Sequence, residues 1–130
     1  MVAVEAVGEW NRALKQWRRV EPVLWPADDF KCDYFIRESS EKNLTNDDAV
    51  AWTSSIGGKE VFLIRGSYEK NAREIIMHEL GHAFGAQHVP GTLMDSEVRG
   101  EPRACPDGPT VAQVAAWNKV DVRLLSWCNE

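Results

Sequence analysis

The stretch REIIMHELGHAFGAQH, residues 73–88, decides how the rest of the chain is interpreted, and it contains all three histidines of the protein. Four residues of an α-helix advance about 6 Å and turn slightly more than once. His78 and His82 therefore project from one face of a predicted helix. The opposite side carries apolar side chains that can be buried, Ile76, Leu80 and Ala83.

The spacing of the polar side chains in this stretch fits a zinc site. His78 and His82 can share a tetrahedral zinc at about 2.0–2.1 Å. Glu79 leaves the helix beside them, which suits a base better than a ligand. Gly85, with a positive φ, would end the helix and turn the chain so that His88 becomes the third ligand. Three neutral imidazoles leave one position for water, as in catalytic zinc sites.

The pattern HExxHxxGxxH followed by Met94, in GTLMDS, resembles the metzincin clan of zinc metallopeptidases. The short distance from His88 to Met94 is most similar to the matrixin-like (matrix-metalloproteinase-like) members. The resemblance is specific over residues 78–94. It implies a Met-turn in which Met94 packs beneath the metal without binding it. It also implies that Glu79 takes a proton from a zinc-bound water, whose pKa falls toward about 7, and passes it to the leaving amine.

The chain departs from the family pattern in two ways that bear on metals. Met94 is followed by Asp95 and Ser96, where many matrixins have a proline and astacin-like relatives have a tyrosine. A tyrosine ligand is therefore not expected. No further histidine remains for a second, structural zinc. A calcium site would be compatible with the resemblance, but no residue of the chain specifies one.

Apolar periodicity and turn residues predict the other elements. We expect an amphipathic helix at residues 4–17, a short strand at 23–25, and strands at 32–38, 49–53 and 60–65. Asn71 with Glu74 resembles a capping box for the histidine-bearing helix, and Thr110 with Gln113 resembles another that opens a last helix. One face of that last helix would carry Val111, Val114, Ala115, Val122 and Leu125. The intervening residues 86–109 form a long connection, which is usually functional.

The element order predicts an α+β (mixed α/β) fold, and 130 residues suit one domain. The resemblance implies a zincin-like domain over 1–130, with an upper part at 1–88 and a lower part at 89–130 that holds the Met-turn and the C-terminal helix. It further implies a twisted, mostly parallel sheet above the active-site helix, with an antiparallel edge strand. That strand would pair with an extended peptide substrate; its residues are Ala49, Val50, Ala51, Trp52 and Thr53.

Composition narrows the choice of partner. Fifteen basic and 20 acidic residues give a net charge of -5, and no basic block is present that could follow a phosphate backbone. No apolar run approaches the roughly 20 residues of a membrane span. We therefore expect neither nucleic acid nor membrane as a partner. The resemblance implies a peptide or protein substrate, and we expect a monomer. The first ten residues lack the pattern of a signal peptide, so secretion is favoured by the family resemblance alone.

Two alternatives concern the cysteines and the function. Cys105 and Cys128 are the favoured disulfide pair, which leaves Cys32 unpaired or bonded to another chain. Alternatively, Cys105 could inhibit the enzyme by placing a thiolate on the zinc.

The rival function is a non-enzymatic, zinc-stabilised binding or assembly domain, with a hydrolase of non-peptide amides as a third option. We therefore predict a zinc-dependent endopeptidase.

Overall fold

A computed structural model describes residues 2–21, 33–39, 51–64, 71–97 and 103–128. The elements in chain order are α1 (Val2–Leu14), β1 (Phe35–Ser39), β2 (Ala51–Thr53), β3 (Glu60–Ile64), α2 (Ala72–Ala83), α3 (Gly108–Asn118) and the 3-10 helix η2 (Val122–Leu124). Helices combined with one small sheet give the predicted α+β class. The strand predicted at 23–25 lies outside the described residues.

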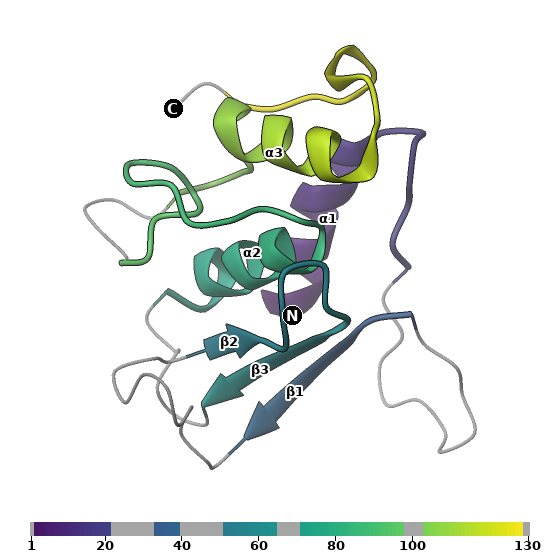
Figure 1. Ribbon diagram of the computed structural model, residues 1–130. Coiled ribbons are helices and arrows are strands. Elements are labelled where there is room, and N and C mark those ends of the chain that lie inside the picture. Colours follow the sequence, from purple (N-terminus) through teal and green to yellow (C-terminus); the bar gives the residue numbers. More distant parts are fainter. Residues whose placement is uncertain (1, 22–32, 40–50, 65–70, 98–102, 129–130) are drawn as a thin grey trace.

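The three described strands form one sheet in the order β1-β3-β2. β1 runs parallel to β3, and β2 runs antiparallel to β3, with Trp52 opposite Phe62. The predicted antiparallel edge strand is therefore present at Ala51, Trp52 and Thr53, whereas residues 49–50 lie outside the described part of the chain. In Figure 1, α2 lies between this sheet and α3.

The core forms where α1 packs across α2. Trp10 is fully buried in α1, and its indole nitrogen donates a hydrogen bond of 2.9 Å to the carbonyl of Met77 in α2. Its ring meets Phe84 edge to face, with 5.2 Å between the ring centroids. The apolar side of α2 is buried as predicted at Ile76, Leu80 and Ala83. This packing leaves the histidine-bearing side of α2 to face the chain that follows.

The predicted helix boundaries were partly wrong. The first helix ends at Leu14, before the predicted residue 17, because Lys15 adopts a left-handed conformation with φ 52°. Asn71 precedes α2 but makes no side-chain capping hydrogen bond, because its φ of -129° and ψ of 36° lie outside the extended region of a cap. The predicted capping box with Glu74 is therefore absent, and Glu74 is buried.

The last helix also begins and ends elsewhere than predicted. Its N-cap is Asp107, whose carboxylate accepts from the backbone nitrogen and the hydroxyl of Thr110. Thr110 is thus a donor in the first turn, so the predicted cap at Thr110 with Gln113 is wrong. The helix closes at Lys119, in the left-handed region with φ 57°. Val122 and Leu125 consequently lie beyond α3, although Leu125 is still buried.

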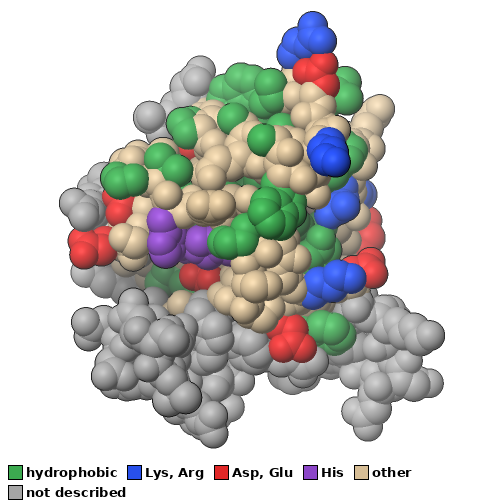
Figure 2. All heavy atoms as spheres, in the orientation of Figure 1, with side chains coloured by type: hydrophobic (Ala, Val, Ile, Leu, Met, Phe, Trp, Pro, Cys, Tyr) green, Lys and Arg blue, Asp and Glu red, His purple; other side chains and the backbone are tan. Residues whose placement is uncertain are grey.

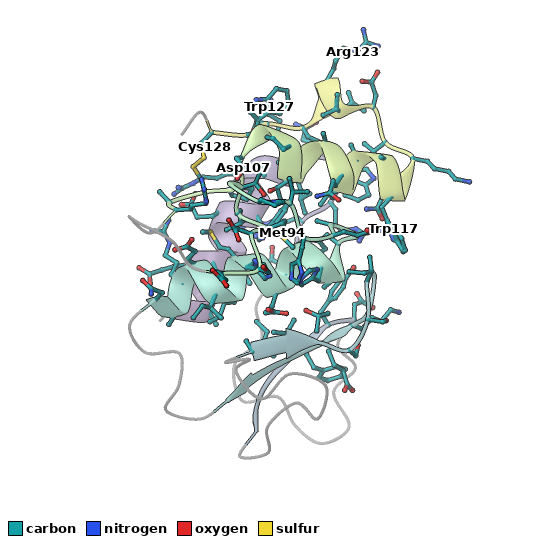
Figure 3. All side chains as sticks on the ribbon, turned by 60° about the vertical axis from the view of Figure 1, so that its left-hand side comes forward. Met94, Asp107, Trp117, Arg123, Trp127 and Cys128 are labelled. Carbon is teal, nitrogen blue, oxygen red and sulfur yellow. A yellow bond between two sulfur atoms is a disulfide. The ribbon has the colours of Figure 1, made fainter. Side chains whose placement is uncertain are left out.

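The predicted disulfide between Cys105 and Cys128 is present (Figure 3). Its formation contradicts the hypothesis of self-inhibition, because a sulfur bonded in a disulfide has no thiolate to offer a metal. Cys32 lies outside the described residues. Among the helices of the described residues, none has the length and apolar character required to cross a membrane.

Candidate metal centre

Three imidazoles converge at the surface of α2. His78 and His82 project from the helix itself, and His88 comes from the segment that follows it. One ring nitrogen from each lies within 4.8 Å of the others, and the Nε2 atoms of His82 and His88 are 3.1 Å apart. Figure 2 shows these side chains together on one face of the molecule. The cluster can hold a metal ion.

The turn that returns His88 to the cluster is made at Gly85. The Gly85 nitrogen donates to the His82 carbonyl at 3.1 Å, and the Ala86 nitrogen donates to the Gly81 carbonyl at 2.8 Å. This pair of bonds is the Schellman motif, which requires positive φ at its glycine, and Gly85 has φ 112°. A Cβ atom at Gly85 would also overlap the Trp117 indole. Glycine is therefore required here for two reasons.

Two backbone carbonyls fix which ring nitrogen can bind a metal. His78 Nδ1 lies 2.8 Å from the Leu93 carbonyl oxygen, and His82 Nδ1 lies 2.8 Å from that of Ala86. A carbonyl oxygen only accepts hydrogen bonds, so each Nδ1 carries the hydrogen. The lone pair of each ring is then at Nε2. Histidines that bind metals through Nε2 are generally held in this way.

The electrostatics of the cluster favour neutral rings. Burial, together with the neighbouring His82, lowers the pKa of His78 to about 4. Burial also lowers the pKa of His82 below its ordinary value. Both rings are consequently neutral near pH 7, the state in which imidazole binds metal. The donor set and its protonation fit a zinc ion, for which tetrahedral bonds of about 2.0–2.1 Å place ligand nitrogens about 3.4 Å apart.

A buried carboxylate completes the site. Glu79 Oε2 lies 3.8 Å from His78 Nε2. The Thr53 hydroxyl lies 2.8 Å from Glu79 Oε1 and 2.8 Å from the Glu79 carbonyl oxygen, and these two acceptors share its one hydrogen. Burial raises the pKa of Glu79 to about 7, and the Thr53 hydrogen bond opposes part of that rise. From the sequence, Thr53 is predicted only as part of the edge strand. The 26-residue separation from Glu79 leaves no local signal of the contact.

Met94 lies fully buried against α2. A Cβ atom at Gly81 would lie 2.5 Å from the Met94 sulfur, so the missing side chain at Gly81 is what admits the methionine. The Met94 carbonyl accepts from Val89 at 3.0 Å, and the Met94 nitrogen donates to Thr92 Oγ1 at 3.0 Å. Gly81 was not predicted as a site residue. Its signal was a glycine inside a helix, which often has a packing reason.

The arrangement can bind a metal through three nitrogens and present an ionisable carboxylate beside it. A metal held there would act as a Lewis acid, and the neighbouring carboxylate can accept and release a proton. The chain matches no protein-family model, no curated protein and no solved structure.

Proposed function

We propose that this protein is a zinc-dependent endopeptidase with a metzincin-like, matrixin-like catalytic domain. The observation that carries the proposal is the position of Glu79 Oε2, 3.8 Å from the metal-facing nitrogen of His78. A structural zinc site has no need for a buried carboxylate that is held beside the ligands without joining them. His78, His82 and His88 would hold the zinc. Imidazole also suits copper, iron and nickel, so the identity of the metal is part of the proposal.

When bound, zinc would supply a Lewis acid that polarises a peptide carbonyl and acidifies water. The chain's own residues supply the proton transfer. Glu79 stands beside the ligands, and its carboxylate can accept a proton from attacking water and return it to the leaving amine. Thr53 holds Oε1 of the carboxylate, so Oε2 is the oxygen left to face the reacting atoms.

The substrate proposed for this site is an extended peptide lying along β2. β2 is at one end of the described sheet, and its Thr53 contacts the proposed base directly. An edge strand offers backbone groups to an extended chain. A peptide paired there would pass close to Glu79. Within the proposed single domain, residues 1–88 would form the upper wall of the cleft, and residues 89–130, with Met94, would form the lower wall.

Elemental analysis combined with digestion of a mixed peptide library tests this function. We expect about one zinc per chain, internal peptide cleavage, and loss of cleavage in a chelator with recovery on adding zinc. Glu79→Ala should retain zinc and lose cleavage. Full zinc content with no cleavage by the parent would favour the non-enzymatic zinc domain. Cleavage by Glu79→Ala at the parent's rate would refute the role given to Glu79.

A further inference from the structure

We propose that Asp107 is a positioning residue for the metal centre and acts on His78 through Leu93. The inference rests on the proposed metal site. The Asp107 carboxylate accepts a hydrogen bond of 2.6 Å from the Leu93 nitrogen at Oδ2, and the Leu93 carbonyl accepts one of 2.8 Å from His78 Nδ1. The backbone N–H and C=O of Leu93 are therefore both hydrogen-bonded, one to Asp107 and the other to His78. Asp107 stands at the start of α3, between Cys128 and Met94 in Figure 3.

Capping α3 does not by itself account for a carboxylate at position 107. The capping bonds from the Thr110 nitrogen and hydroxyl both go to Oδ1. One oxygen suffices for a cap, and asparagine or serine supplies it about as well. The second oxygen is used only for Leu93 among the bonds of the described residues. Asp107 is only 6% exposed, and a buried carboxylate is costly unless it is hydrogen-bonded. Both carboxylate oxygens of Asp107 thus accept hydrogen bonds, and Oδ2 binds the residue that contacts His78.

The hydrogen bond between His78 and Leu93 matters because an imidazole held only by a metal can still turn about the bonds of its side chain. The hydrogen bond from Nδ1 fixes both the tautomer and the plane of the ring. That bond is only as rigid as Leu93, whose position Asp107 sets. Asp107 is itself anchored, since it pairs with Cys128 as an isolated bridge and Cys128 forms the disulfide with Cys105.

Asp107→Asn separates the two uses of the side chain. Its amide oxygen can still cap α3, while its NH2 group would face the Leu93 nitrogen, a donor opposite a donor. We expect the folded variant to bind zinc about 10- to 100-fold more weakly than the parent, measured by competition with a chelating dye. Asp107→Ser, which also retains a cap but offers Leu93 no acceptor, should show the same direction of change.

Two control variants separate positioning from stability and charge. Asp121→Asn removes the same charge at another N-cap, that of η2, where Asp121 accepts from the Arg123 nitrogen. Thr110→Val removes one capping hydrogen bond at Asp107 Oδ1 and leaves Leu93 untouched. The second should lower the melting temperature, and neither should change the zinc dissociation constant by more than about twofold.

Parent-like zinc affinity in folded Asp107→Asn would overturn the proposal. If both Asp107 variants fail to fold, nitrogen-15 NMR of the zinc-loaded parent decides. His78 should carry its proton at Nδ1 and the Leu93 amide should exchange slowly, whereas zinc bound through Nδ1 or a fast-exchanging amide would refute the link. The readout here is zinc affinity. A parent protein that binds zinc but cleaves no peptide would therefore refute the proposed peptidase activity without contradicting the role of Asp107. A parent that binds no zinc overturns both.

Discussion

Replacing Gly85 with alanine should be far more damaging than the same change at Gly91, although both glycines have positive φ. Gly85 has φ 112° and Gly91 has φ 80°, so each alanine meets backbone strain of about 1–2 kcal/mol. Their surroundings differ. A Cβ atom at Gly91 would meet nothing within 4 Å, whereas at Gly85 it would overlap the Trp117 ring. Overpacking of this kind costs about 1–3 kcal/mol more.

The expected loss of unfolding free energy is therefore about 1–2 kcal/mol for Gly91→Ala and about 2–5 kcal/mol for Gly85→Ala. Urea unfolding of the metal-free proteins measures both. Adding Trp117→Ala to Gly85→Ala should recover the steric part and leave the backbone part, a coupling that a double-mutant cycle isolates. Gly85→Ala should also weaken zinc binding, because the turn at Gly85 delivers His88 to the cluster.

Equal destabilisation at the two glycines would refute the steric argument, since it would mean that Trp117 moves aside without cost. Unchanged zinc affinity in a folded Gly85→Ala protein would refute the role of the turn. The two results are independent. The first concerns packing between α2 and α3, and the second concerns the path of the chain from Gly85 to His88.

Three further outcomes are expected. Thr53→Val should lower kcat about 10- to 100-fold with zinc affinity unchanged, as steady-state kinetics and dye competition would show. Glu79→Gln should retain zinc and lose cleavage. In the folded metal-free parent, burial raises the pKa of Glu79 from 4.5 to about 7, so the folded chain binds this proton more tightly than the unfolded chain. The contribution of Glu79 to stability is therefore lost as the pH rises from 4.5 to about 7. The metal-free variant should thus unfold at higher urea than the parent at pH 8 and match it at pH 4. Zinc at a hundredfold excess over Kd should raise the unfolding free energy by about 2.7 kcal/mol, and a chelator should reverse this.

Local patterns in the sequence were enough to predict the helix that carries the histidines. The spacing from His78 to His82 requires only helical geometry. The return of His88 requires only one glycine with positive φ, and Gly85 has it. These signals lie within eleven residues, so no knowledge of the remaining fold was needed. The disulfide between Cys105 and Cys128 was predicted from position alone and is present.

Contacts between distant segments could not be predicted in this way. The hydroxyl of Thr53 meets Glu79 only because β2 lies beside α2 in the folded chain, and the sequence does not encode that register locally. The start of α3 was missed for another reason. Asp107 and Thr110 are both good capping residues, and the hydrogen bond from the Leu93 nitrogen that also holds Asp107 comes from a distant segment. Pro109, common in the first turn of helices, was the local signal that favoured Asp107.

His78 and Glu79 are adjacent in the sequence, yet different parts of the fold hold them. The sheet holds the carboxylate through Thr53, whereas the C-terminal part holds the imidazole through Leu93. Loosening Leu93 should therefore weaken the metal site and leave the position of the carboxylate unchanged. Loosening Thr53 should slow proton transfer and leave the metal bound. Thr53→Val could instead lower zinc affinity as much as Asp107→Asn does. In that case the positions of Glu79 and His78 would depend on each other, and the division of roles between the two sides of α2 would be wrong.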